Sequence, residues 1–207
     1  MTSLSDRKLR NRLAVLLVTA IVLAACGRDV ASGELQGVVV DPPAEKPSFT
    51  LTDTSGDPYE FATETEDKLA LLYFGYLNCP DICPVHLAQI AEVFDRLPEV
   101  ARDAEVVFVS VDPARDSPEE IREFLDRFDP RFVGLTGSPE ELITAQEAAG
   151  VPPATIVGDG EGYTVDHAGW VISYAPDGLN HAIYPFGVRQ SEWTNDLQLL
   201  AAMENEG

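Results

Sequence analysis

The sequence predicts one α/β domain, a mixed central sheet flanked by helices, with an N-terminal β-hairpin extension. Two continuous apolar runs, at residues 69–76 and 106–111, are typical of central strands covered on both faces. Helical patterns follow each run. The last third instead indicates two consecutive strands and a helix, which makes the predicted sheet mixed rather than purely parallel.

In the first half of the domain, alternating apolar residues predict strands, and apolar residues at helical spacing then predict a helix. Alternating residues at 49–53 and 59–61, joined by Ser55-Gly56-Asp57, predict the β-hairpin. The strand at 69–76 follows. Apolar residues then recur at helical spacing and predict an amphipathic helix that Pro98 ends (Leu87, Ile90, Ala91, Phe94 and Leu97).

The second half begins with the strand at 106–111 and carries clear end signals. Ser117 with Glu120, and Ser138 with Glu141, have the spacing of capping boxes, and Gly150 is placed to close the second of these helices. A short strand at 132–136 separates them. Strands are predicted at 165–174 and 181–186 with a turn at 175–178, followed by a final helix at 190–203.

The N-terminus has the pattern of a signal peptide. Basic residues precede an apolar run at 13–25, which is shorter than the about 20 residues of a typical spanning helix. The run ends Leu23-Ala24-Ala25-Cys26, which resembles a bacterial lipobox and implies that Cys26 is lipidated. The alternative is an ordinary signal peptide with a chance cysteine.

This pattern sets the predicted organisation of the chain. We expect residues 1–25 to be a lipoprotein signal peptide, 26–47 a tether whose end can pair as an edge strand, and 48–207 the folded domain. The protein is predicted to be exported and held by lipid at the outer face of the bacterial cytoplasmic membrane.

The charge excludes one large class of partner. The chain carries 35 acidic and 14 basic residues, a formal net charge of −21. So acidic a surface repels phosphate backbones, which argues against nucleic-acid binding. An acidic surface also suits a basic partner or a cation, although solubility alone explains it as well.

Two cysteines are left for chemistry once Cys26 is assigned to lipid. Cys79 and Cys83 stand where a strand ends and a helix begins, where the helix N-terminus favours thiolate over thiol. Such a pair at a strand-to-helix junction is thioredoxin-like. However, three residues separate the cysteines, and Asp81 among them is expected to raise the thiol pKa values, which a bound cation would relieve. The loop is compatible with thiol exchange and is better explained by a metal.

A two-thiolate site needs a further ligand, and the candidates are three histidines. His167 is favoured, because in a thioredoxin-like fold the loop before its strand faces the cysteine pair. Asp166 beside it could orient the imidazole. His86, three residues after Cys83, could also approach, and His181 begins the last strand, but both are more simply explained as solvated or core residues. Two sulfurs and one nitrogen favour copper, Cu(I) or Cu(II), over zinc, which more often takes a fourth protein ligand.

Three segments together resemble the Sco/SenC family of copper-binding assembly factors. They are Gly75-Tyr76-Leu77-Asn78-Cys79-Pro80-Asp81-Ile82-Cys83-Pro84, Phe108-Val109-Ser110-Val111-Asp112-Pro113-Ala114-Arg115-Asp116, and Val165-Asp166-His167, in the family's order and approximate spacing. The resemblance runs from about residue 48 to the C-terminus. The family usually anchors through an N-terminal membrane helix, a role that the lipobox would take here.

The resemblance implies a thioredoxin-like fold in which Cys79, Cys83 and His167 bind one copper ion. It also implies a role in building the dinuclear copper centre of cytochrome c oxidase, by donating copper or by keeping cysteines reduced. Asp112 matches the family's acidic residue after the central strand, and it is expected beside the site or at a partner contact; capping a turn is the simpler alternative.

These observations leave two functions open. One is a copper chaperone whose partner is the copper-bearing subunit of cytochrome c oxidase or another copper chaperone. The other is a membrane-anchored thiol-disulfide oxidoreductase that reduces partner cysteines with Cys79 and Cys83, so enzymatic activity is left undecided. A peroxidase is disfavoured because Tyr76 and Pro80, not threonine, stand three residues before the cysteines.

A partner surface is expected from the loops around the site. Arg115 and Asp116, together with the late hairpin tip at Asp177-Gly178, are predicted to form the surface that meets the oxidase, since loops commonly carry partner contacts.

Overall fold

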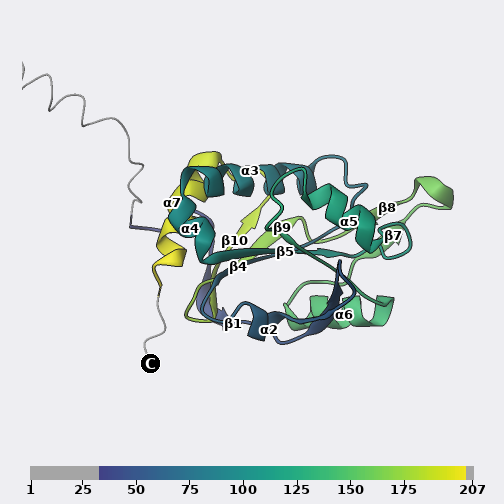
Figure 1. Cartoon of the computed structure of the whole chain (residues 1–207), viewed down its shortest axis with the longest axis horizontal. Coiled ribbons are helices and arrows are strands. Elements are labelled where there is room, and N and C mark those ends of the chain that lie inside the picture. The colour runs from purple at the N-terminus through teal and green to yellow at the C-terminus, as the bar shows by residue number, and fades with distance from the viewer. Residues whose placement is uncertain (1–32, 204–207) are drawn as a thin grey trace, which may run out of the picture. The chain divides into compact units, whose positions relative to one another are not determined.

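A mixed eight-stranded sheet runs through the middle of the domain, with helices on both of its faces (Figure 1). The structure is a computed structural model and describes residues 33–203. The strand order across the sheet is β1-β10-β9-β4-β5-β6-β2-β3. The strands are β1 (Val38–Glu45), β2 (Thr50–Asp53), β3 (Pro58–Glu60), β4 (Leu69–Gly75), β5 (Ala104–Ser110), β6 (Val133–Thr136), β9 (Trp170–Tyr174) and β10 (Leu179–Pro185).

The two strands predicted to be central lie side by side in the middle of the sheet. β4 and β5 are parallel, with Gly75 opposite Ser110, and β6 continues the parallel part. On the other side of β4 the sheet becomes antiparallel through β9, β10 and β1. The predicted mixed sheet and N-terminal hairpin, formed by β2 and β3, are confirmed. The register matters for function because it sets which loops meet at the end of β4.

The helices cover both faces of this sheet. α3, α4, α5 and α7 lie on one face and α2 and α6 on the other (Figure 1). Successive side chains of β4 point to opposite faces of the sheet and join two separate hydrophobic cores. Leu69, Leu71 and Tyr73 pack into one core, and Ala70, Leu72 and Phe74 into the other. The helices are α2 (Phe61–Glu64), α3 (Ile82–Arg96), α4 (Pro98–Arg102), α5 (Pro118–Leu125), α6 (Pro139–Ala148) and α7 (Gln190–Ala201).

Helix ends were predictable because their signals are local. Both capping boxes form, with the Ser117 and Ser138 side chains accepting from the backbone N–H groups of Glu120 and Glu141. Gly150 closes α6 with φ of +68°, a conformation that glycine adopts without strain. The short helices α2 and α4 were not predicted.

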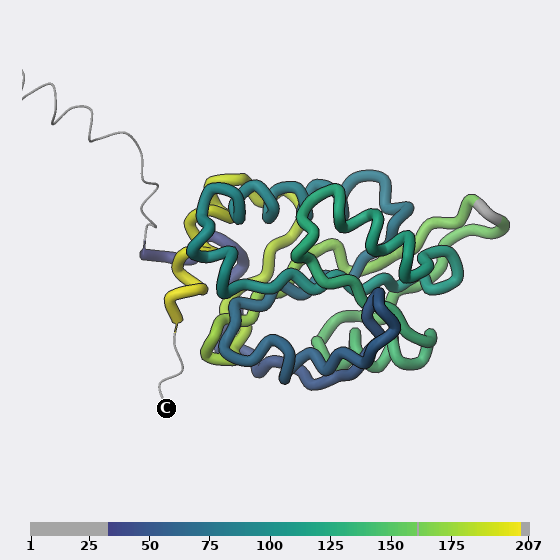
Figure 2. The backbone as a smooth tube through the Cα atoms, in the orientation of Figure 1, coloured from purple at the N-terminus to yellow at the C-terminus, as the bar shows by residue number. Residues whose placement is uncertain are grey.

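The strand predicted at 165–174 is wrong as one element. It is broken at residues 167–169 into β8 (Thr164–Asp166) and β9, and β8 pairs with the unpredicted β7 (Thr155–Val157) in a separate two-stranded sheet. This β7–β8 hairpin extends away from the body of the domain and includes a 3-10 turn (Gly160–Gly162) (Figures 1 and 2). The break places His167 in a connection between two sheets.

The end of the predicted tether pairs as an edge strand, as expected: β1 adds to β10. The predicted signal peptide and the predicted lipidation site Cys26 lie outside the described residues. Within residues 33–203, no helix has the length and apolar character that crossing a membrane would require.

Candidate metal centre

The two cysteines lie where β4 leaves the sheet and α3 begins. α3 starts at Ile82, so Cys83 and Pro84 occupy its first turn, while Cys79 lies in the preceding loop. Both cysteines are free thiols; Cys79 is 8% exposed and Cys83 is fully buried. Gly75 makes room for them, because a Cβ at that position would lie 2.8 Å from the Cys83 sulfur.

His167 joins the cysteines from the connection between β8 and β9. β9 pairs antiparallel with β4, so the N-terminal end of β9 lies at the same end of the sheet as the cysteine loop. The His167 Nε2 lies 3.9 Å from the Cys83 Sγ, and the donor atoms of Cys79, Cys83 and His167 all lie within 4.8 Å of one another. The sequence prediction brought together the same three residues.

The orientation of the imidazole is set by the backbone. Its Nδ1 lies 3.1 Å from the Ala168 carbonyl oxygen, which can only accept, so Nδ1 carries a proton and Nε2 is the ring nitrogen turned toward the sulfurs. Asp166, expected to orient His167, is exposed. The Ala168 carbonyl oxygen, and not that carboxylate, lies beside the imidazole Nδ1.

The other two histidines are not part of the cluster. His86 is fully buried against the Tyr73 and Trp193 rings, and burial lowers its pKa. The His181 Nε2 lies 2.7 Å from the Asp177 carboxylate at the β9–β10 turn.

That turn is at the far end of the sheet. Tyr174 at the end of β9 lies opposite Ala70 near the start of β4, whereas the cysteines follow the end of β4. The predicted surface combining Arg115, Asp116 and Asp177-Gly178 is therefore wrong, because antiparallel pairing carries this turn away from the cysteines.

The pKa values of the two thiols are shifted in opposite directions. The pKa of Cys79 is lowered to about 3, first because the Cys83 thiol donates to its sulfur, and further by hydrogen bonds from His167 and from the backbone N–H groups of Cys83 and Asp81. Burial and the bond to Cys79 raise the pKa of Cys83. The Tyr73 hydroxyl donates to the Cys83 sulfur at 3.3 Å. The expectation that Asp81 raises the thiol pKa values is wrong for Cys79, because hydrogen bonds to its sulfur, from the Cys83 thiol above all, lower its pKa.

We expect this asymmetry to appear in alkylation. Cys79 should react with iodoacetamide at a rate nearly independent of pH from 5 to 8, since it is a thiolate throughout that range, whereas an ordinary thiol reacts about tenfold faster per pH unit there. Peptide mapping by mass spectrometry measures each cysteine separately. Cys83→Ala, which removes the main donor, should restore part of the pH dependence; a tenfold rise per unit in the parent chain would contradict the low pKa.

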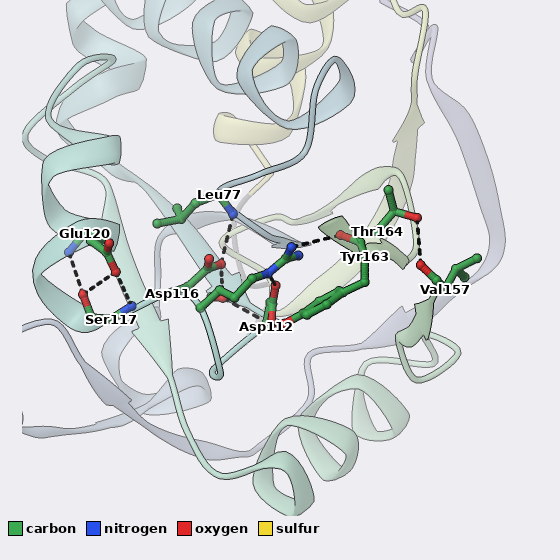
Figure 3. Close-up of polar contacts among 10 residues, drawn as sticks. Leu77, Asp112, Asp116, Ser117, Glu120, Val157, Tyr163 and Thr164 are labelled. Carbon is green, nitrogen blue, oxygen red and sulfur yellow. Dashed lines mark hydrogen bonds and ion pairs between the residues drawn. The ribbon is translucent and has the colours of Figure 1, made fainter. Parts of the chain in front are cut away.

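Asp112 lies in the loop after β5, where it is 2% exposed. It bonds Arg115 and Tyr163 rather than the cysteines or His167 (Figure 3). Tyr73 and Tyr163 were both missed at the sequence level. A cavity of about 320 Å³ opens on the His167 side of the cluster, lined by Pro152, Pro153, Thr155, Asp166, His167, Ala168 and Trp170.

The donor set fits a soft or borderline metal ion. Two sulfurs and one imidazole nitrogen are ligands that copper and zinc accept, and thiolates select Cu(I) strongly. Within residues 33–203, no further cysteine, histidine or carboxylate joins the cluster of three. The site therefore offers three protein ligands and leaves further positions open.

Comparison with known proteins agrees with this geometry. A sequence model of SCO1/SenC matches residues 40–202. A relative from Stutzerimonas stutzeri is 35% identical over 175 residues, covering 81% of this chain and 83% of its own. The SenC protein of Rhodobacter capsulatus is 42% identical over 104 residues, covering 48% of this chain and 45% of SenC.

Solved structures extend the likeness to three dimensions. Bradyrhizobium japonicum ScoI with copper bound has a TM-score of 0.67 and 32% identity, covering 76% of this chain and 99% of ScoI. Apo Sco1 of Thermus thermophilus has a TM-score of 0.73 and 32% identity, covering 81% and 97%. The thioredoxin-like fold is thereby confirmed, and this chain belongs to the SCO1/SenC family.

Proposed function

We propose that this chain binds one copper ion through Cys79, Cys83 and His167 and assists assembly of the dinuclear copper centre of cytochrome c oxidase. The observation that carries the proposal is the convergence of two sulfurs and one imidazole nitrogen within 4.8 Å. ScoI of Bradyrhizobium japonicum and yeast Sco1 have been solved with copper bound. BsSco is described as a member of the Sco family of cytochrome c oxidase assembly proteins.

The protonation of the site suits capture of a cation. Cys79 is already a thiolate at neutral pH, so it offers a negative charge before the metal arrives. His167 offers the Nε2 lone pair, and Cys83 gives up its proton on binding. In this proposal copper is the ion that the protein carries and transfers, and as a soft metal ion it is bound well by both sulfurs.

The surroundings suit release of the metal as well. His167 is half-buried and borders the open cavity, so a partner's ligand can approach the cluster from that side. We place the domain at the outer face of the cytoplasmic membrane, held by lipid on Cys26. The recipient in this proposal is the copper-bearing subunit of the oxidase or another copper chaperone.

A metal competition tests the copper assignment. Cys26→Ser leaves Cys79 and Cys83 as the remaining thiols, and this reduced chain is offered equal amounts of copper and zinc. We expect about one copper per chain and little zinc, because two sulfurs and one nitrogen leave zinc short of a protein ligand. The Cys79→Ser/Cys83→Ser chain should retain neither metal, and preferential retention of zinc by the parent would contradict the proposal.

A second candidate function rests on the acidity of Cys79. A thiolate beside a protonated thiol can attack a partner disulfide, release one partner thiol, and be resolved by Cys83, leaving a Cys79–Cys83 disulfide and a reduced partner. This reaction does not need His167. Thiol exchange that persists in His167→Ala while copper binding is lost separates the two activities.

A further inference from the structure

The loop that follows β5, residues 111–116, contacts both segments that carry the proposed copper ligands (Figure 3). On the cysteine side, the buried Asp116 carboxylate accepts hydrogen bonds from the Ser110 hydroxyl at 2.6 Å and from the Leu77 backbone N–H at 3.0 Å. Leu77 is two residues before Cys79. The loop is therefore fixed relative to the cysteine segment.

On the histidine side, the same loop holds Tyr163 at three points. The Tyr163 hydroxyl donates to the Asp112 Oδ1 at 2.6 Å. The Arg115 Nη1 donates to the Tyr163 carbonyl oxygen at 2.9 Å, and the guanidinium lies 3.5 Å from the centre of the Tyr163 ring. The Arg115 Nε closes the set by donating to the Asp112 Oδ2 at 2.6 Å. The hydroxyl, the ring and the backbone carbonyl of Tyr163 therefore all contact this loop.

These contacts matter because β8 is not a strand of the main sheet. Tyr163 directly precedes β8 and His167 directly follows it, and β8 pairs with β7 alone. Without ladder bonds to the central sheet, β8 is held by its pairing with β7, by the packing and backbone of Val165, which is 6% exposed and hydrogen-bonded to Tyr76, and by the contacts at Tyr163. Charge-assisted hydrogen bonds of this kind are stronger than neutral ones and fix direction as well as distance.

We propose that Asp112, Arg115 and Tyr163 form a clamp that positions His167, so that its Nε2 faces the sulfurs of Cys79 and Cys83. The three are positioning residues and not ligands. The inference rests on the proposed copper binding for its effect on affinity. It deepens that function by naming the residues that set the distance between the histidine and the cysteine halves of the site.

Arg115→Gln and Tyr163→Phe test the clamp in the Cys26→Ser chain. Each is expected to lower Cu(II) affinity about 10-fold to 100-fold, the range typical when partners that orient a metal ligand are lost. The nitrogen couplings in the electron paramagnetic resonance spectrum of the Cu(II) form should weaken, because the imidazole is no longer held against the metal. In a His167→Ala background, Arg115→Gln should have no further effect on affinity.

Matched controls remove equivalent contacts elsewhere. The Arg122 Nε donates to Asp126 and its Nη1 to the Phe132 carbonyl, the same pattern as Arg115, so Arg122→Gln is the control for arginine loss. The Tyr59 hydroxyl donates to Glu105 at 2.7 Å, so Tyr59→Phe is the control for hydroxyl loss. Both should leave affinity and spectrum unchanged even where they lower thermal stability.

A copper-free readout separates this proposal from the function on which it rests. Modification of His167 by diethyl pyrocarbonate in the apo chain should speed up in Arg115→Gln and Tyr163→Phe but not in the controls. If the parent chain binds no copper, the proposed function fails, and this rate still decides the clamp. Unchanged His167 reactivity, or an affinity loss equally large without His167, overturns the clamp.

Discussion

Replacing His167 with alanine should lower copper affinity by at least about 100-fold, more than is usual for the loss of a residue that merely orients a ligand. The Nε2 is one of three donor atoms within 4.8 Å, and alanine leaves only the two sulfurs. Fold stability should change little, because the side chain is only half-buried. Competition against a chelator of known affinity measures the loss, and denaturant unfolding measures stability.

The thiols report whether the effect is specific. Cys79 and Cys83 should still form a disulfide on mild oxidation in His167→Ala, since both sulfurs are carried by the loop after β4 and the first turn of α3. His181→Ala is the matched control: this imidazole bonds Asp177 at the opposite end of the sheet. Copper affinity in His167→Ala equal to that of the parent would reject the three-ligand centre and leave the dithiol reaction as the better account.

The central strands and helix ends could be predicted because each depends on neighbours in sequence. The apolar run before Cys79 is long enough to identify a buried strand, and Ser117 and Ser138 carry their capping partners three residues on. The metal cluster could not be predicted from neighbours in sequence alone. His167 lies 84 residues after Cys83, so their meeting was foreseen from the fold and the family resemblance and not from any local pattern.

The parts that were missed depend on contacts without a local signal. Tyr163 and Asp112 are 51 residues apart, and nothing around either residue indicates that a hydroxyl and a carboxylate will meet. The break between β8 and β9 follows from the departure of the β7–β8 hairpin from the main sheet, which alternation alone does not reveal. The low pKa of Cys79 has no local signal either, because it depends on the Cys83 thiol and on His167 from a distant segment, both bonded to its sulfur.

Phe108→Ala should reduce the free energy of unfolding by about 3–5 kcal/mol, the usual loss for a large aromatic side chain removed from a core. Phe108 is fully buried in β5, and its ring contacts those of Tyr73 and Phe124. That loss is a large share of the about 5–15 kcal/mol by which domains are stable. Urea unfolding of the reduced, metal-free chain, monitored by circular dichroism, gives the value.

The same substitution separates support of the site from direct binding. The Phe108 ring packs edge-on against Tyr73, whose hydroxyl donates to the Cys83 sulfur. Copper affinity should therefore fall together with stability, whereas His167→Ala should affect affinity alone. Phe186→Ala is the control, since that ring is 54% exposed and its loss should cost under about 1 kcal/mol. A Phe108→Ala chain as stable as this control would show that the core beneath the cysteines repacks freely. The positions of the cysteines would then be set by their own loop and the first turn of α3, not by the packing of the central sheet.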